Sequence, residues 1–375
     1  MSRARFKRTA AVLAVAVCST AAVACGNSQA PTQAAGDFDS SVFPDSTFQG
    51  LSGSLTWYDS SGGLTAEAKN ETVWKDFTAL TGLPSQAEYT DGTSTKFRAA
   101  AESGNVPWNL VEFGTGGEYF QAAEAGLLEE VDTDVVPVDM LDGASVDKYG
   151  IKVEDNASVL VWNANAFGGK KPTSSADLFN VTDFPGKRCL YKYPVSGGTL
   201  EVALLADGVP AAEMYPLDVD RALAKLDTIK NDIVWWESGA TVLQLLNNGE
   251  CAMGMVWTGR VYDAIVQQKL PLEFTWDGGM TTAAYFAVPK GAPNPEVGQA
   301  ALAMWLLDRK GQIGFVDRTT YTTAIKDLSA TDYDTKVQPY VVSKDNAVNT
   351  VAESAEYYAT NLDSVSNALA TFQSQ

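Results

Sequence analysis

Short apolar runs alternate with small polar turns and amphipathic stretches along most of the chain. The apolar runs predict strands at 55–58, 110–113, 189–193, 234–236 and 253–257. Each is followed by a turn rich in Gly, Ser or Thr and then by apolar residues at helical spacing. This alternation of strand and helix predicts an α/β fold with a parallel sheet and helices on both faces.

The five turns are expected to lie at one edge of that sheet. In parallel sheets the carboxyl ends of the strands share an edge, and ligands bind beyond it. Glycine permits a close approach of the backbone, and the free amides at a helix start attract anions. Turns of this composition are also ordinary loops and helix caps, but five of them together favour a binding cleft.

The first 24 residues have the pattern of an export signal. Four basic residues precede an apolar stretch too short to span a bilayer. Small residues then lead to Cys25, which resembles the cysteine that is lipidated in bacterial lipoproteins. We therefore expect a lipoprotein signal peptide over 1–24 and a flexible tether over 25–49, which is rich in Ser, Gln, Ala and Pro. A plain secretory signal is the alternative.

Composition excludes several classes of function. The chain of 375 residues has a formal net charge of −19, which argues against a nucleic-acid partner. It contains no histidine, so it lacks the commonest general base and any Ser-His-Asp triad. The sequence shows no metal-binding cluster and no phosphate-binding loop, and we expect neither a metal nor a cofactor. A serine hydrolase using Ser145 and Lys148 is a remote alternative, because the motifs that accompany this pair in β-lactamases are missing.

The cysteines after the leader are Cys189 and Cys251. Each lies in an apolar run that predicts a core strand, and an exported protein meets an oxidising environment. We expect a disulfide between them; two buried free thiols are the alternative.

Aromatic and charged residues stand next to the predicted turns. Trp236, Trp257 and Trp276 each end a predicted strand, where an indole ring can form a wall of a cleft or cover a cation. Asp277 follows Trp276 directly, a pairing that suits an ammonium group; an ordinary turn aspartate is the alternative.

Arg260 is placed by the pattern at the start of a helix, after a turn formed by Thr258 and Gly259. A cation is unfavourable beside the positive end of a helix dipole unless an anion is near. The anion is either a carboxylate of the ligand or a protein acid, namely Asp59, Asp277 or Glu237.

The chain from about residue 51 to its end resembles the extracellular solute-binding proteins of ABC importers, in the spermidine/putrescine-receptor branch. The resemblance rests on the stretches ESGNVPWNLV (102–111), FPGKR (184–188), EVALLADGV (201–209), YPLDVDRA (215–222), WWESGA (235–240), GECAMG (249–254) and VPKGAP (288–293).

The resemblance implies a two-lobed, periplasmic-binding-protein-like α/β fold of type II, with the ligand in a cleft between the lobes. Lobe 1 is expected over 50–157 and 285–340, and lobe 2 over 158–284. The strands that cross between the lobes are expected near 157–160 and 284–288. Residues 341–375 are expected to form C-terminal helices packed across both lobes.

The resemblance also implies ligand contacts, with two departures. Aromatic residues of polyamine receptors match Tyr58, Trp257, Trp276 and Tyr321, and Asp277 can supply an acid. One acid of the third turn is missing here, and Glu201 is expected to face away from the site. Where those receptors have a small polar residue, this chain has Arg260.

A guanidinium in the cleft repels a polycation and suits a carboxylate. We therefore expect a lipid-anchored, monomeric receptor on the outer face of the cytoplasmic membrane. It would deliver a small amine-bearing solute, such as the ω-amino acid γ-aminobutyrate, to an ABC permease without chemical change. A polyamine receptor is the alternative within the class; a surface interaction protein without a small ligand is the alternative outside it. The expected ligand contacts are Tyr58, Asp59, Ser61, Thr115, Ser158, Trp236, Trp257, Arg260, Trp276, Asp277, Tyr285 and Tyr321.

Overall fold

The computed structural model of the chain describes residues 43–60, 62–89, 94–141 and 143–375. The described residues belong to one compact unit. Cys25, the expected signal peptide and most of the expected tether lie outside the described residues. No helix within the described ranges has the length and apolar character needed to cross a membrane.

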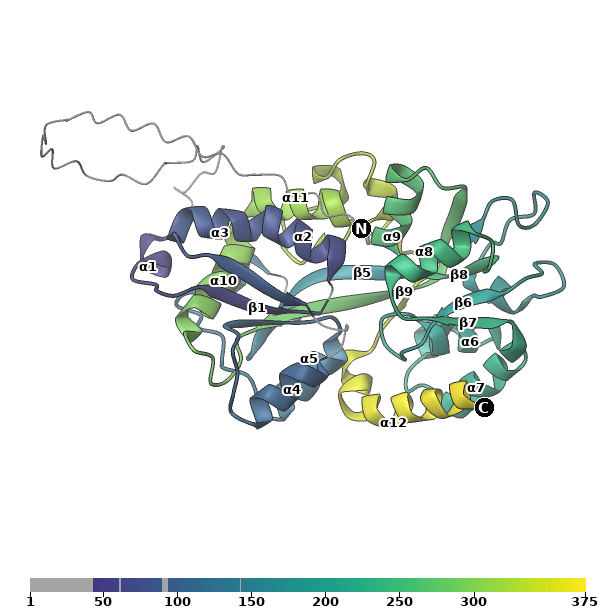
Figure 1. Cartoon of the computed structure of the whole chain (residues 1–375), viewed down its shortest axis with the longest axis horizontal. Coiled ribbons are helices and arrows are strands. Elements are labelled where there is room, and N and C mark those ends of the chain that lie inside the picture. The colour runs from purple at the N-terminus through teal and green to yellow at the C-terminus, as the bar shows by residue number, and fades with distance from the viewer. Residues whose placement is uncertain (1–42, 61, 90–93, 142) are drawn as a thin grey trace, which may run out of the picture. The chain divides into compact units, whose positions relative to one another are not determined.

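Strands and helices alternate through the described chain (Figure 1). The strands are β1 (Leu55–Asp59), β2 (Ser85–Tyr89), β3 (Leu110–Phe113), β4 (Val146–Asp147), β5 (Gly150–Asn163), β6 (Arg188–Tyr191), β7 (Ile233–Trp236), β8 (Met253–Trp257), β9 (Leu272–Ala287), β10 (Thr322–Thr323) and β11 (Val351–Ala352). The α-helices are α1 (Asp45–Phe48), α2 (Gly63–Glu71), α3 (Val73–Thr81), α4 (Thr95–Glu102), α5 (Gly116–Glu124), α6 (Thr199–Ala206), α7 (Val219–Asp227), α8 (Gly239–Asn247), α9 (Thr258–Tyr262), α10 (Pro295–Leu307), α11 (Arg309–Thr319) and α12 (Ala355–Ser374).

The strands pair in the order β2-β1-β3-β9-β5-β8-β6-β7. β1 is parallel to β2 and β3, and β6 is parallel to β7 and β8, as the alternation of strand and helix predicts. Between these parallel groups, β5 and β9 run antiparallel to each other and to their outer neighbours β8 and β3. The two long central strands therefore join two parallel α/β halves.

Helices cover both sides of each half. In Figure 1, α2, α3 and α11 lie on one side of the first group of strands, and α4 and α5 lie on the other. The first half has an aromatic core that includes Tyr58, Trp108 and Tyr119. The second half has a core built from β6, α6, β8 and the inward face of α12.

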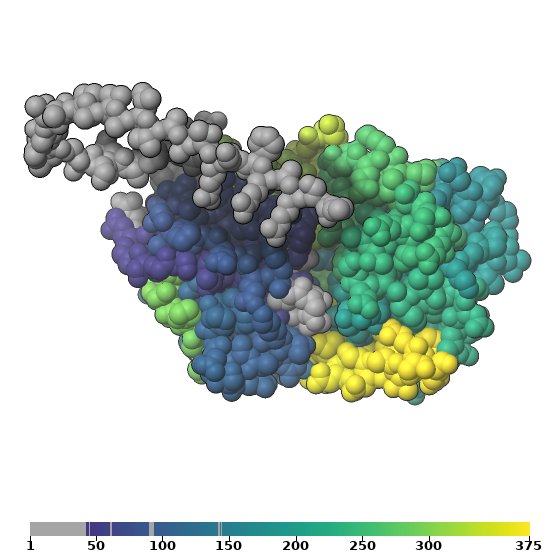
Figure 2. Space-filling model, in the orientation of Figure 1, coloured from purple at the N-terminus to yellow at the C-terminus, as the bar shows by residue number. Residues whose placement is uncertain are grey.

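α12 reaches across both halves, packing against α5 of the first and α7 of the second. In the space-filling view it follows the lower edge of the second half and meets the first half at one end (Figure 2). Within 341–375, all of which the structure describes, it is the one α-helix.

Two local predictions were wrong. The helix expected after the first strand is divided into α2 and α3, because Thr72 leaves the helical conformation at φ −120° and ψ −102°. The turn expected at Thr258 and Gly259 does not exist, since α9 begins at Thr258 directly after β8. Arg260 is therefore the third residue of that helix.

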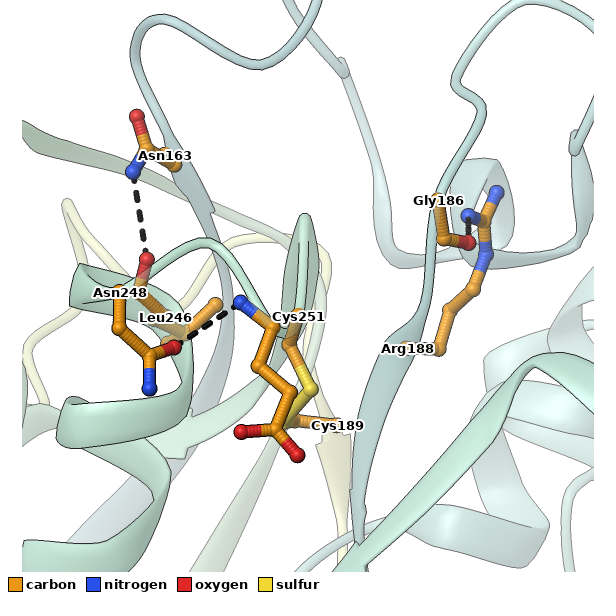
Figure 3. Close-up of a disulfide and its surroundings, with 8 residues drawn as sticks. Asn163, Gly186, Arg188, Cys189, Leu246, Asn248 and Cys251 are labelled. Atoms are coloured by element: carbon orange, nitrogen blue, oxygen red, sulfur yellow. Dashed lines mark hydrogen bonds between the residues drawn. A yellow bond between two sulfur atoms is a disulfide. The ribbon is translucent and has the colours of Figure 1, made fainter.

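Cys189 of β6 and Cys251, just before β8, form a disulfide in the structure (Figure 3). The neighbouring Arg188 is buried, and its guanidinium donates to the carbonyls of Leu178, Gly186 and Phe184. Burial lowers the pKa of Arg188, and these carbonyls supply the acceptors that its buried charge requires. The bridge and the arginine together fix the start of β6.

Candidate functional site

A cavity of about 350 Å³ lies where the strand-end turns of the two halves meet. Its lining comes from the turns after β1, β3 and β6, from the ends of β6 and β8, from β5, from the chain after α11, and from or beside α2, α4, α5, α9 and α12. The lining residues are Ser60, Thr65, Ser94, Thr95, Arg98, Gly114, Thr115, Glu118, Gln121, Glu154, Asn156, Tyr191, Tyr193, Pro194, Val195, Ser196, Trp257, Arg260, Tyr321, Leu362, Asp363 and Ser366. This is the location that parallel strands favour for a ligand.

Arg260 is a cation of this cavity without a protein counter-ion in the described chain. Its side chain lies over Gly239, where a Cβ atom would come within 2.5 Å of Nε. A Cβ atom placed on Gly63 would lie 3.4 Å from the terminal nitrogen Nη2 of Arg260. Across the described ranges, no carboxylate approaches the Arg260 guanidinium within 4.0 Å. The guanidinium therefore presents its N–H donors to the cavity.

The protein acids considered as partners for Arg260 have other neighbours. Glu237 forms an ion pair with Lys192 at 2.7 Å, and Asp277 accepts a hydrogen bond from Asn349 at 2.9 Å. Asp59 accepts one from the amide of Gly62 at 3.1 Å. The structure forms no bridge between Arg260 and any of them.

One wall of the cavity is aromatic. The Trp257 ring packs edge-on against Tyr191, with ring centroids 5.1 Å apart, and against Trp236 at 4.9 Å. Trp257 Nε1 donates to the carbonyl of Ser196 at 3.0 Å, which joins the end of β8 to the turn after β6. Ser196 has a φ of +66°, an unusual conformation for a residue other than glycine, and its amide donates to Glu353 at 2.7 Å.

Acids from three elements also line the cavity: Glu118 of α5, Glu154 of β5 and Asp363 of α12. Burial raises the pKa of Glu154 to about 7, against the opposing effect of Lys69. Burial also raises the pKa of the lining Tyr321 to about 12, so this side chain is a neutral phenol at physiological pH. The cavity thus carries both signs of charge, with an aromatic wall.

Four of the expected ligand contacts line the cavity: Thr115, Trp257, Arg260 and Tyr321. Thr115 also caps α5, since its hydroxyl accepts from the amide of Glu118. Ser61 lies outside the described residues.

Seven expected contacts do not line the cavity. Tyr58, Asp59, Ser158 and Trp236 are fully buried, and Trp236 supports the aromatic wall from behind. Tyr285 is stacked on Tyr119, with centroids 4.5 Å apart. Trp276 donates to the carbonyl of Pro339, and Asp277 is held by Asn349.

Trp276 and Asp277 are absent from the lining for a topological reason. The pattern around Gly278 and Gly279 predicts a turn at the end of a short strand, but β9 continues through it from Leu272 to Ala287. These residues therefore lie inside β9, at an irregularity over 276–279 that is not paired with β5, and they do not line the cavity.

Glu154, Arg98 and Asp363 line the cavity but were not predicted from the sequence. Glu118 could have been found, because it follows the glycine-rich turn at the start of α5. Glu154 lies in a long central strand and Asp363 in α12, and no local pattern associates either with the turns. Glu201 is buried outside the lining and accepts hydrogen bonds from Tyr215 and Tyr358, both at 2.9 Å.

The residues proposed for hydrolase chemistry do not form a pair. Ser145 is buried, whereas the Lys148 ammonium is exposed and pairs with Glu130 at 2.7 Å. Within the described ranges, no group of three or more His, Cys, Asp or Glu residues is placed to hold a metal ion.

Comparisons with known proteins identify the class to which this fold and cavity belong. Residues 72–344 match the family model of the bacterial extracellular solute-binding proteins, and the chain belongs to this family. It is therefore an exported protein of the type that captures a small solute for an ABC importer. The resemblance inferred from the sequence is confirmed, and so is the two-lobed fold of periplasmic binding proteins.

Particular relatives are similar over most of their length. A γ-aminobutyric acid-binding protein of Pseudomonas aeruginosa is 35% identical over 252 residues, which cover 64% of this chain and 69% of the relative. A solved structure described as the Atu4243-GABA receptor is 33% identical with a TM-score of 0.76, covering 85% of this chain and 97% of that one. An ABC transporter substrate-binding protein from Bradyrhizobium japonicum is 28% identical with a TM-score of 0.75, covering 86% and 99%.

Proposed function

We propose that this protein is the receptor for a small ω-amino acid, with γ-aminobutyrate as the representative ligand, and that it delivers the ligand unchanged to an ABC permease. The observation that carries the proposal is Arg260, a cation that lines the cavity and forms no ion pair within the described chain. A guanidinium binds a carboxylate through two parallel hydrogen bonds. The similarity to two proteins described as binding this ligand supports the same choice.

The remaining lining supports a zwitterion. Trp257 and Tyr191 form an apolar wall for a short methylene chain, and the acids supply the negative potential that an ammonium group needs. A polyamine is disfavoured, because it would meet the charge of Arg260 without a carboxylate to offset it.

The arrangement at the membrane is part of the proposal. We infer that the leader is removed before Cys25, that lipid on this cysteine anchors the receptor, and that it acts as a monomer.

We also infer a first lobe over 50–157 and 285–340 and a second over 158–284, with β5 and β9 as the connection that bends when the lobes close. No bond of the solute is made or broken at any step.

A thermal-shift panel tests this function. Binding to the folded state alone raises stability by about 2.7 kcal/mol at a hundred times the dissociation constant. We expect γ-aminobutyrate to raise the melting temperature of the wild type and to leave that of Arg260→Ala unchanged. Arg221→Ala is the matched control, because Arg221 is half-exposed and pairs with Asp207 outside the cavity. Stabilisation of both wild type and Arg260→Ala by putrescine or spermidine would contradict the proposal.

A further inference from the structure

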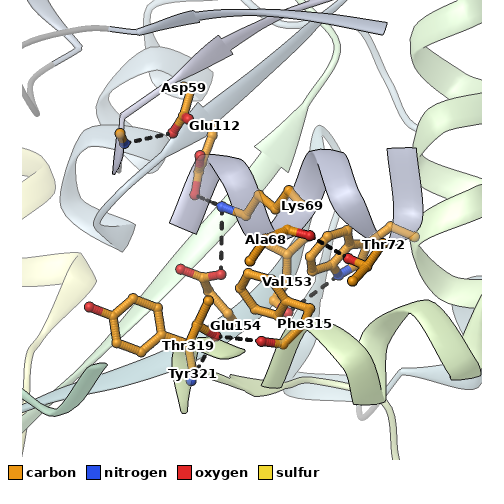
Figure 4. A network of polar contacts seen from close by, with 12 residues as sticks. Asp59, Ala68, Lys69, Thr72, Glu112, Val153, Glu154, Phe315, Thr319 and Tyr321 are labelled. Carbon is orange, nitrogen blue, oxygen red and sulfur yellow. Dashed lines mark hydrogen bonds and ion pairs between the residues drawn. The ribbon is translucent and has the colours of Figure 1, made fainter. Parts of the chain in front are cut away.

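Glu154 is a buried carboxylate that faces the cavity. It lies on the central strand β5, is 1% exposed, and belongs to the cavity lining. Its oxygen Oε2 forms an ion pair with Lys69 Nζ at 3.6 Å (Figure 4), but it accepts no hydrogen bond from the described residues. A buried carboxylate oxygen without a donor is costly, so this position favours an incoming hydrogen-bond donor.

Charge balance behind the cavity leaves Glu154 as the excess acid. Lys69, from α2, is fully buried and in close contact with Glu112 of β3. Burial opposes the charge on Lys69, but Glu112, Glu154 and Asp59 outweigh it and raise the pKa of the lysine. Lys69 forms ion pairs with both Glu112 and Glu154, so two buried carboxylates share its single positive charge. Burial is the main cause that raises the pKa of Glu154 to about 7; Lys69 opposes this shift, and the nearby charge of Glu112 adds to it.

We propose that Glu154 binds the ammonium group of the solute and releases its own proton as the solute enters. This deepens the proposed function, and it rests on the solute being a zwitterion. The O–H bond of Glu154 breaks and its proton passes to the solvent. The ammonium keeps its N–H bonds and donates them to the carboxylate that is left. The ligand's positive charge then restores the balance that Lys69 alone does not provide.

The other groups that face Glu154 fit this exchange. Tyr321, which follows α11, interacts electrostatically with both Glu154 and Arg260. Arg260 lines the same cavity but lies beyond 4.0 Å from Glu154, so the two opposite charges do not neutralise each other. Asp155 on the same strand is paired with Lys152 at 3.0 Å. A zwitterion satisfies both separated charges at once.

The other acids of the cavity are less suited to this role. Glu118 Oε1 already accepts the amide of Ser94 at 2.8 Å. Asp363 is exposed on α12, where water solvates it and an ion pair contributes little. Among the lining acids, Glu154 is the one whose burial most favours a positively charged partner.

Proton release measured on the wild-type protein tests the exchange without any variant. γ-Aminobutyrate is titrated calorimetrically between pH 5.5 and 8.5, in pairs of buffers with different ionisation enthalpies. We expect proton release that approaches one per ligand at the acidic end. We also expect the affinity to fall about tenfold for each pH unit well below 7, because one proton competes with the ligand. Binding of γ-aminobutyrate with no proton release overturns this inference and leaves the receptor function intact.

The Glu154→Gln variant tests whether the proton released on binding comes from Glu154. Gln preserves the size of the side chain but cannot ionise, so we expect the affinity to fall about 10- to 100-fold and the proton release to disappear. Glu273→Gln, in an ion pair with Lys171 outside the cavity, is the matched control and should behave as the wild type. Proton release retained in a folded Glu154→Gln overturns the assignment. If no amino acid binds the wild type at all, the proposed function fails instead.

Discussion

At the scale of the residue, the position of Arg260 depends on Gly239, which has no side chain to obstruct it. Gly239 is the first residue of α8, and the stem of Arg260 crosses it where a Cβ would be 2.5 to 2.9 Å from Nε, Cγ and Cδ. A guanidinium on a flexible stem needs such a surface to hold it towards a ligand. The glycine therefore contributes to binding without touching the solute.

Gly239→Ala separates binding from stability. Alanine at the start of a helix is as stable as glycine or better by up to about 1 kcal/mol, and the clash falls on a movable side chain. We expect the free energy of unfolding to be unchanged or raised, and the affinity for γ-aminobutyrate to fall at least tenfold as Arg260 is displaced. Calorimetric titration and denaturant unfolding measure the two quantities. Affinity equal to the wild type would show that Arg260 does not need this surface.

At the scale of the element, β6 and β8 carry the aromatic wall at their carboxyl ends and the disulfide near their starts. Tyr191 ends β6 and Trp257 ends β8, while Cys189 and Cys251 lie two and six residues earlier. The strands also pair directly, with Arg188 opposite Met253. The pairing of β6 with β8 is thus sufficient to align Tyr191 and Trp257 once the chain is folded.

Replacement of both cysteines by alanine is expected to affect folding more than binding. Their sequence separation is 62 residues, and loss of a bridge over such a loop costs about 2–4 kcal/mol, mainly by releasing the unfolded chain. We expect the free energy of unfolding to fall by this amount, with affinity within about threefold of the wild type. The wild type measured in reductant is the control. A folded double variant that no longer binds would mean that the bridge itself shapes the cavity.

The elements also show how far local pattern predicts a site of this kind. The repeated strand, turn and helix units could be predicted, and with them Thr115 and Trp257, because each lies at its own strand end. Trp276 and Asp277 lie inside β9, because the strand continues past an irregularity at 276–279, where the glycines predict a turn. Glu154 and Asp363 depend on strand order and on the path of α12, which no short stretch of sequence encodes.

At the scale of the whole molecule, buried acids set the pH dependence of stability. Burial raises the pKa of Glu353 to about 8 and that of Asp308 to about 7. Such groups bind protons more tightly when folded than when unfolded. Their contribution to stability is complete below the ordinary carboxyl pKa and is lost as the pH rises to the folded value. The ligand-free protein should therefore be less stable at pH 8.5 than at pH 5.5.

Asp308→Asn tests this dependence at a position remote from the cavity. Asp308 caps α11 by accepting the amide of Gly311 at 2.8 Å, and Asn preserves such a cap without titrating. We expect the decline in the free energy of unfolding between pH 5.5 and 8.5 to become smaller by about 1–3 kcal/mol. Glu237→Gln at the exposed pair with Lys192 is the control. A decline as steep as in the wild type would exclude Asp308 as a source.

The most direct test of the whole account is a crystal structure of the receptor with γ-aminobutyrate. We expect the ligand's carboxylate to accept two hydrogen bonds from the guanidinium of Arg260, its methylene chain to lie against Trp257, and its ammonium to donate to Glu154. A complex in which Arg260 pairs with a protein acid, and the ligand's carboxylate lies elsewhere, would contradict the account.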